Sequence, residues 1–505
     1  MATIINNGVA ASGLNVSLVA NDAKQASNNQ SELRRALNAG GLVSFVNPGI
    51  YYLAADTFTP APNTTLLLSP GVYFSVGGVL GLPSTLAAIA AQSFQPRQWS
   101  PPKVRVVKRM TDATRIVTAS SGTAPTFSLD ASSPFGRTAY KVAMAAGTTF
   151  AEVGYNDLNV PNFNGHVAYR IWVEDYTKIN DIKLYVGNSG YALNSFLTDT
   201  IITSDAQMFN GERVLYVGPS RINTGGTFVF GSTTLANTKI RFTPNAATNV
   251  WVDAIEIPER TNPAVCLTFD DGYRSWLTYL KPLLDGYGMK ATFNINTSTI
   301  GTNDALYPTS GDIVRLANEG HQITCHNISN LKYIASPQPG DQTLTQYMND
   351  YTTARKTLEG YGLPVSGFGY HSYVQGGFDQ ALIDALRSEG VRCARIASLP
   401  KNMIYGSGLG NDIMALRTYE LGTNYPVSTV TAGLDTLNTY GGAAIIMGHD
   451  TVANTATPTG VQVTAADLES VLARIAAYGM ETLTMNDFYS RIYAVNSLYR
   501  NTYAN

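Results

Sequence analysis

Charged side chains are scarce in this sequence. Asp, Glu, Lys and Arg make up 14% of the 505 residues, against about a quarter in an average soluble domain. The formal net charge is −2, and Lys and Arg form no long run. Nucleic acid and anionic membranes are therefore not expected as partners, because both bind to clustered cations. Asn, Thr, Ser, Gly and Tyr are abundant instead, which is typical of β-structure with an uncharged polar surface.

Cysteine and long apolar runs are scarce as well. Cys266, Cys325 and Cys393 form no Cys-x-x-Cys pair, so neither a disulfide framework nor a cysteine metal site is predicted. No apolar run approaches the ~20 residues that cross a bilayer. The first residues, MATIINNGVAASG, lack the charged and apolar regions of a signal peptide. We therefore expect no membrane span and no export leader.

The length and a hydrophobic content of 44% allow about three domains. The first, residues 1–99, contains a helical segment, SELRRALNAGG (Ser31–Gly41), with Ser31 as a candidate N-cap. Two similar turns, PGIYYL and PGVYF, begin 22 residues apart at Pro48 and Pro70. That spacing fits one rung of a solenoid, and the segment resembles the start of bacteriophage β-helix tailspikes. A plain β-rich trimerisation or attachment module is the alternative.

Residues 100–260 show the alternation of apolar and polar residues that is typical of strands. HVAYRIWVED, DIKLYV, TKIRFTP and NVWVDAIEIP all have this pattern, and each is bounded by turn residues. Such spacing predicts a two-sheet β-sandwich with jelly-roll connectivity. The segment WVDAIEIP resembles the last strand of carbohydrate-binding jelly rolls.

Residues 261–505 alternate between strand-like and helix-like segments. This order predicts a parallel sheet, and the number of units favours a (β/α) barrel. Chemistry in such barrels collects at the carboxyl ends of the strands. Five polar residues lie at or just after predicted strand ends: Asp270, Asp271, His326, His371 and His449.

These residues are suited to metal-dependent hydrolysis. Asp271 and His326 offer an oxygen and a nitrogen ligand for zinc or a similar divalent ion, and Asn330 lies four residues further on. Such an ion lowers the pKa of a bound water towards ~7. Asp270, off the metal, is the predicted general base, and His449 the predicted acid for the leaving group.

The segments LTFDDG, GHQITCHN and IIMGHD resemble the motifs of NodB-type polysaccharide deacetylases, the carbohydrate esterases of family four. The resemblance covers Thr261 to the end of the chain. It implies removal of acetyl groups from sugar polymers on a distorted (β/α) barrel with a metal held by Asp-His-His. By position, Asp270 is the base, Asp271 and His326 are metal ligands and His449 is the acid. His321, in the same segment as His326, is expected to be structural.

Two departures from the family pattern stand out. The second metal histidine falls at Asn330, a weaker ligand for zinc, so the affinity falls or the metal differs. Zinc is the expected ion, with cobalt, nickel and manganese as alternatives. His371 is a second candidate for the third ligand.

The other departure is in the motif R-x-P-Y-G, which here reads GYHSY and lacks its arginine and proline. Arg395 is predicted to orient the base instead. The residues around the backbone N–H expected to face the substrate are Tyr370, His371 and Ser372.

The sequence thus predicts a metal-dependent deacetylase of an acetylated bacterial surface polysaccharide, capsule or O-antigen, on a phage tail. The tailspike-like start implies a homotrimer. One alternative is a catalytically inactive glycan-binding tail protein, which the broken motifs would permit. Another is a bacterial cell-wall or exopolysaccharide deacetylase with the same chemistry.

Overall fold

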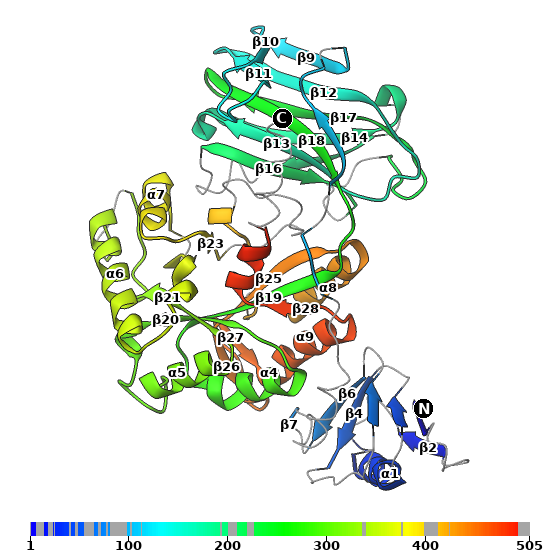
Figure 1. Ribbon diagram of the computed structural model, residues 1–505, viewed down its shortest axis with the longest axis vertical. Coiled ribbons are helices and arrows are strands. Elements are labelled where there is room, and N and C mark those ends of the chain that lie inside the picture. The colour runs from blue at the N-terminus through cyan, green and yellow to red at the C-terminus, as the bar shows by residue number, and fades with distance from the viewer. Residues whose placement is uncertain are drawn as a thin grey trace.

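The structure is a computed structural model. It describes residues 98–492 except 102–103, 113, 192–193, 200–209, 220–226, 336–339, 375–376, 398–412 and 424. Before residue 98 it describes 2–6, 15–18, 24, 26–39, 42–45, 49–54, 65–68, 72–76 and 79–80. Three bodies follow one another along the chain (Figure 1). Among the described residues, no helix has the length and apolar character needed to cross a membrane.

The N-terminal body combines one helix with short strands: β1 (Ala2–Asn6), β2 (Asn15–Leu18), α1 (Ala26–Ala39), β3 (Leu42–Phe45), β4 (Gly49–Leu53), β5 (Thr65–Leu68), β6 (Val72–Val76) and β7 (Val79–Leu80). Two parallel pairs, β3 with β5 and β4 with β6, join residues 23 positions apart. The predicted N-cap is wrong: Ser31 lies inside α1, and its hydroxyl donates to the carbonyl oxygen of Ser27. The predicted turns at Pro48 and Pro70 lie outside the described residues.

The middle body is a sandwich of two antiparallel sheets. One contains β8 (Val104–Arg109), β10 (Thr126–Asp130), β11 (Ala139–Met144), β13 (Val167–Val173), β16 (Gly211–Val217) and β18 (Thr248–Pro258). The other contains β9 (Ile116–Gly122), β12 (Thr148–Val160), β14 (Ile179–Gly187), β15 (Asn194–Asp199) and β17 (Leu235–Pro244). Apolar side chains from both sheets, such as Val142 and Val252 opposite Val153 and Ile240, form one core. The predicted sandwich is confirmed.

The C-terminal body alternates strands and helices. Its main sheet has the order β21-β20-β19-β25-β24, with β28 also on β19, and all of these pairs are parallel. The strands are β19 (Pro263–Asp271), β20 (Thr292–Asn296), β21 (Gln322–Asn327), β24 (Tyr419–Glu420), β25 (Gly442–Gly448) and β28 (Glu481–Leu483). A separate parallel pair is formed by β22 (Tyr370–Ser372) and β23 (Cys393–Arg395), and another by β26 (Asp450–Val452) and β27 (Gln462–Thr464).

Helices cover this sheet on the outside (Figure 1). They are α4 (Lys281–Tyr287), α5 (Ser310–Asn318), α6 (Leu344–Gly360), α7 (Gln380–Ser388), α8 (Val427–Tyr440) and α9 (Ala465–Ala477). Thr309 and Thr343 start α5 and α6 with capping boxes, in which the threonine hydroxyl accepts from the N–H three residues later. Every residue of β19, β20 and β21 is buried, as expected for parallel strands covered on both faces.

Trp99 ties the start of the sandwich region to the C-terminal body. Its indole is 1% exposed and stacks on Phe488 at 5.6 Å. Its backbone N–H donates to Glu481, and its carbonyl oxygen accepts from Arg491. The chain therefore contacts the C-terminal body both before and after the sandwich.

Candidate active site

The two adjacent aspartates lie at the carboxyl end of β19. Successive strand residues ordinarily point to opposite faces, but Asp271 has a φ of 80° and interrupts that alternation. Both carboxylates approach the same imidazole: Nε2 of His326 lies 3.8 Å from Oδ2 of Asp270 and 3.5 Å from Oδ1 of Asp271. The predicted convergence of strand ends is therefore present, because β19 and β21 flank β20 in one parallel sheet.

Asp270 is held by three hydrogen-bond donors. Nδ2 of Asn294 lies 2.5 Å from its Oδ1, the hydroxyl of Ser372 donates to its Oδ2 at 3.1 Å, and the guanidinium of Arg395 donates to Oδ1. Burial alone would raise the pKa of this carboxyl, but Arg395 and the nearby histidines outweigh it. The pKa of Asp270 therefore lies well below its ordinary value of 3.8. This carboxylate is ionised at neutral pH and can accept a proton.

The register of β22 and β23 explains two of these donors. Ser372 and Arg395 are paired residues at the ends of these strands, so one strand pair delivers a hydroxyl and a guanidinium to the same carboxylate. Arg395 is fully buried and is paired with Asp270. The structure thus places Arg395 where the missing motif arginine was expected to act.

His326 presents its second nitrogen to the aspartates. Its Nδ1 lies 2.9 Å from the carbonyl oxygen of Ser372, to which it must donate because a carbonyl only accepts. In the neutral ring, Nε2 then carries a free lone pair, and this nitrogen faces Asp271. A backbone partner of this kind is the usual way in which a metal-binding histidine is oriented.

Asn330 is linked to Asp271 by the side-chain amide of Asn296, a residue that sequence reasoning missed. Nδ2 of Asn296 donates to Oδ1 of Asp271 at 3.0 Å and to Oδ1 of Asn330 at 2.8 Å. Asn296 is 2% exposed, so these bonds fix both oxygens.

These donors fit a divalent ion. Two ligands of a tetrahedral zinc lie roughly 3.3 Å apart when each is ~2 Å from the ion, and the Asp271 oxygen and His326 nitrogen are 3.5 Å apart. With Asn330 the set is two oxygens and one nitrogen. Such a set is harder than an Asp-His-His site and suits zinc less and manganese more.

His449 directly follows β25, which is the strand next to β19. Its carbonyl oxygen accepts from the Trp276 indole at 2.8 Å, and the N–H of Thr451 donates to the Ser275 hydroxyl at 3.1 Å. The segment after the two aspartates therefore holds the chain at this histidine and just after it. Glu420, which sequence reasoning missed, is close enough for its carboxylate to interact electrostatically with His449, and burial raises the pKa of Glu420.

The GYHSY segment is enclosed. Nδ1 of His371 contacts the carbonyl oxygen of Cys325 at 3.2 Å, and its Nε2 contacts the hydroxyl of Tyr347 at 2.9 Å. Its ring would have to give up one of these bonds to become a metal ligand, which favours Asn330 as the third ligand. Tyr370 and His371 are 1% and 0% exposed; that they and Ser372 bind substrate stays a prediction.

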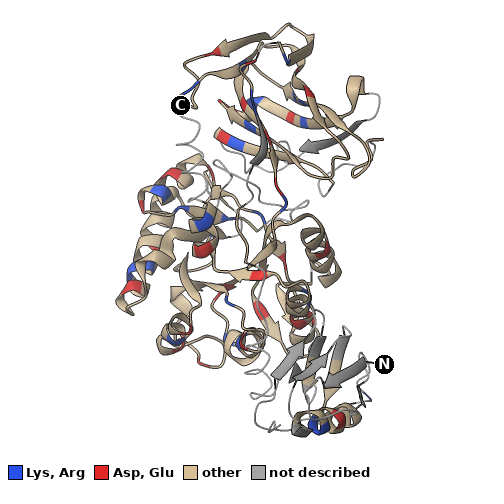
Figure 2. Cartoon of the chain, turned by 45° about the vertical axis from the view of Figure 1, so that its right-hand side comes forward, with Lys and Arg blue, Asp and Glu red and all other residues tan. Residues whose placement is uncertain are grey.

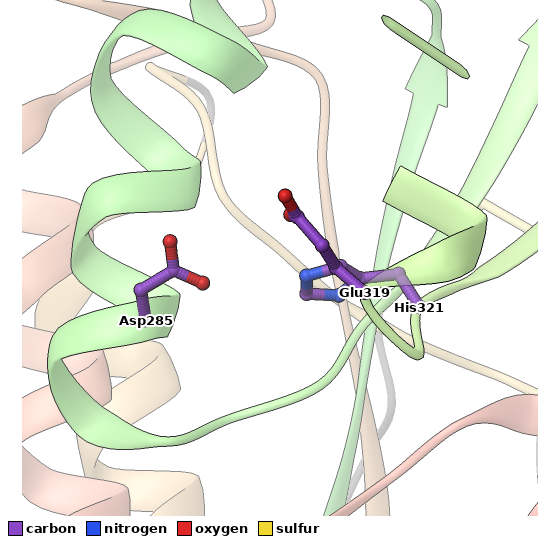
Figure 3. Close-up of side chains that lie close together, drawn as sticks. All are labelled: Asp285, Glu319 and His321. Atoms are coloured by element: carbon purple, nitrogen blue, oxygen red, sulfur yellow. The ribbon is translucent and has the colours of Figure 1, made fainter. Parts of the chain in front are cut away.

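A second group of metal-ligand residues lies elsewhere, formed by Asp285 at the end of α4 with Glu319 and His321 after α5 (Figure 3). An ammonium already joins its acids, because Nζ of Lys281 lies 2.5 Å from Asp285 and 2.8 Å from Glu319. Burial lowers the pKa of His321 to about 4. Its Nδ1 accepts the Ala291 N–H, so the neutral ring carries its proton on Nε2. These contacts favour an ion-pair cluster rather than a metal site.

Comparison with known families assigns part of the C-terminal body. Residues 258–394 match the family model of polysaccharide deacetylases. This segment is a polysaccharide deacetylase domain. The match includes Asp270, Asp271, His326 and Asn330, and ends before Arg395 and His449. Enzymes of this class are hydrolases. The comparison with curated proteins finds no match.

Three solved structures show how distant the similarities are. Peptidoglycan deacetylase PdaC from Bacillus subtilis is 15% identical, over 48% of this chain and 97% of its own, with a TM-score of 0.30. A family 4 acetyl xylan esterase from Clostridium thermocellum, in complex with a cobalt ion, is 19% identical over 46% and 92%, also with a TM-score of 0.30. A family 4 carbohydrate esterase from Streptomyces lividans is 15% identical over 44% and 92%, with a TM-score of 0.29. Values this low carry no argument about function.

Proposed function

We propose that the C-terminal domain releases acetate from an acetylated bacterial polysaccharide by metal-dependent hydrolysis. The observation that supports this most is the environment of Asp270. Its buried carboxylate is kept ionised by Arg395 and lies beside the candidate metal ligands Asp271 and His326. A base, a metal site and a further histidine within one group are the parts that acyl hydrolysis needs.

Each residue has a defined task in this mechanism. The chemistry supplied by a divalent ion held at Asp271, His326 and Asn330 is polarisation of the acetyl carbonyl and acidification of a water. Asp270 accepts a proton from the attacking water, and Arg395 fixes the orientation of that carboxylate. His449 gives a proton to the sugar oxygen or nitrogen as its bond to the acetyl carbon breaks. The products are acetate and a free hydroxyl or amine.

The substrate and setting are finer proposals. We place the enzyme on a bacteriophage tail, where it acts as a homotrimer on the capsule or O-antigen of the host. The 23-residue offset of the parallel pairs β3–β5 and β4–β6 supports a tailspike-like start. The alternative setting is a bacterial cell-wall or exopolysaccharide deacetylase, whose chemistry at Asp270 would be the same.

The strand order of the sandwich supports a jelly-roll module beside this domain. From β11 to β18, the sheets have the orders β11-β18-β13-β16 and β12-β17-β14-β15. Strands equally far from the middle of this eight-strand run are therefore neighbours: β11 with β18, β12 with β17, β13 with β16 and β14 with β15. This pairing is expected for a jelly roll built from two Greek keys.

Acetate release tests the proposed function. The wild type should release acetate from acetylated xylan, N-acetylglucosamine oligomers or bacterial surface polysaccharides once loaded with metal. Asp270→Asn should lower that rate about 10²–10⁴-fold, the usual contribution of a general base. The matched control is Asp285→Asn, which makes the same change at an exposed carboxylate of the ion-pair cluster and should leave the rate unchanged. Full release by Asp270→Asn would refute the mechanism.

The alternative is an inactive glycan-binding protein. The observation that favours it is Asn330, an amide where the family has its second metal histidine. Glycan binding with no release of acetate, unaffected by Asp270→Asn, would establish this reading.

A further inference from the structure

Two tryptophans face each other across neighbouring strands of the sandwich. Trp172 on β13 and Trp251 on β18 are paired in register. Their chain neighbours, such as Ile171 and Val252, lie in the sandwich core. Because strand side chains alternate between faces, both indoles lie on the outer face of this sheet.

Neighbouring side chains fix the orientation of these rings. The indole N–H of Trp251 donates to Asp130 at 2.8 Å, and Nζ of Lys141 lies 5.3 Å from its ring centre. Phe135 packs edge-on against Trp172, with ring centres 5.9 Å apart. Trp172 remains partly exposed. A pre-oriented aromatic surface of this kind loses little conformational entropy on binding.

The indoles form one wall of a shallow cavity of about 530 Å³. Polar side chains from two domains complete its lining: Glu174 and Asn210 from the sandwich, and Gln380 and Asp384 from α7 of the deacetylase domain. Nε2 of Gln380 donates to Asp384 at 2.8 Å, and Asn249 donates to Glu174 through both its backbone and side chain. Amide and carboxylate groups are therefore held in place around the aromatic wall.

We propose that this cavity is a saccharide-binding subsite that holds the polysaccharide substrate at a distance from the reacting acetyl group. A sugar ring has apolar C–H faces that pack on aromatic rings, and hydroxyls that both donate to carboxylates and accept from amides. The lining, in which indole rings lie beside amide and carboxylate groups, matches that division. Two acids in the lining, Glu174 and Asp384, disfavour an anionic stretch of glycan.

The position of α7 connects this subsite to the active site. Ser372, which donates to Asp270, precedes Asp379, the N-cap of α7, by seven residues, and Gln380 is the first residue of that helix. α7 thus lines the cavity and follows, in the chain, the strand that supplies a hydrogen-bond donor to the catalytic carboxylate. The choice of a polysaccharide as the ligand of this cavity rests on the proposed function.

Binding and kinetics of tryptophan variants test the subsite. The probes are acetylated xylan, an N-acetylglucosamine pentamer and a panel of purified capsule and O-antigen polysaccharides. Binding is measured by affinity electrophoresis and tryptophan fluorescence in an Asp270→Asn background, so that no turnover occurs. Trp172→Ala should weaken binding of at least one probe about tenfold or more. In the active enzyme it should raise KM for that polymer more than it lowers kcat.

Two further variants separate stacking from folding. Trp172→Phe keeps an aromatic ring and should retain most of the affinity. Tyr185→Ala removes an aromatic side chain from β14 in the opposite sheet. It should bind the probes as the Asp270→Asn protein with Trp172 intact does. The subsite proposal is overturned if Trp172→Ala binds the probes with unchanged affinity. It is also overturned if the Asp270→Asn protein with Trp172 intact binds none of them. Acetate release without dependence on Trp172 would leave the proposed function standing, whereas Trp172-dependent binding without acetate release would leave only the subsite.

Discussion

The sandwich and the deacetylase domain use their few charges in opposite ways. In the sandwich, charged side chains lie across sheet faces and pair with one another, as Arg170 does with Glu212 and Glu256. In the deacetylase domain, strands such as β19 are buried throughout, and the chemistry lies at their ends. Figure 2 shows acidic and basic residues interspersed along both.

The difference follows from how each sheet is covered. An antiparallel sheet with one open face alternates apolar and polar residues, so its charges are spread along the strand. Parallel strands covered on both faces leave charged groups room only near the strand ends. Charges in the sandwich are therefore expected to act on stability, and charges at the strand ends of the deacetylase domain on function.

Metal binding is expected to show the largest effect. Asp271→Ala should abolish the single tight divalent site in calorimetric titration of chelator-stripped protein, because it removes an anionic ligand. Asn330→His should tighten zinc binding at least tenfold, because imidazole suits zinc better than an amide. Asp285→Ala, in the ion-pair cluster, is the control and should bind metal like the wild type. A site that is lost in Asp285→Ala and kept in Asp271→Ala would place the metal in that cluster instead.

The next largest effect concerns the pH dependence of acetate release. Arg395→Met removes the cation that lowers the pKa of Asp270, so that pKa rises. Since Asp270 acts as a base only when ionised, the acidic limb of kcat/KM should move to higher pH, with the greatest loss at low pH. Arg395→Lys keeps the charge and should shift the limb less. An unmoved acidic limb in Arg395→Met would show that another group sets it.

Breaking a buried ion pair in the sandwich should lower stability and leave catalysis unchanged. Asp253 is fully buried and accepts from Arg109 and Arg137. Asp253→Ala should lower the free energy of unfolding by about 3 kcal/mol, as when one partner of a buried pair is removed, measured by denaturant titration. The kcat for a small acetyl ester should stay unchanged in the folded protein. A large fall in kcat would contradict the division of tasks between the domains.

The last effect is a change in how stability depends on pH. Burial raises the pKa of Glu469 in α9 to about 8, whereas its ordinary value is 4.5. Between these values the folded state retains a proton that the unfolded state has lost, so this group makes stability fall as pH rises from about 4.5 to about 8. Glu469→Gln removes the ionisation and should raise Tm relative to the wild type more at pH 8 than at pH 5. Equal shifts at both pH values would mean that the carboxyl does not titrate in this range.

Much of the fold was readable from short-range pattern. Period-two alternation predicted the sandwich, and alternating strands and helices predicted the parallel sheet, because both patterns reflect which faces are buried. The start of α1 was predicted six residues too late, since Ser31 resembles an N-cap but lies inside a longer helix. Asn29, ahead of Ser31 in this helix, is buried, and its side-chain amide donates to the carbonyl oxygen of Tyr52, a contact that no local capping preference records.

The partners of the site residues could be predicted less well. Asn294 and Asn296 alternate with apolar residues in TFNIN, a signal that two polar groups share one face of a buried strand, yet nothing local indicates what they contact. Only the parallel register places Asn294 beside Asp270.

By itself, the sequence determined which residue types stand at the strand ends, and with them the base Asp270 and the ligands Asp271 and His326 as candidates. Arg395 was also a candidate from the sequence, but its contact with Asp270 and the contact of His371 with Tyr347 depend on the tertiary structure. The tertiary structure also decided that Trp172 and Trp251 share a cavity with α7. Strand ends are set by local pattern, whereas contacts between residues a hundred positions apart depend on how strands are ordered and how domains pack, which no local pattern records.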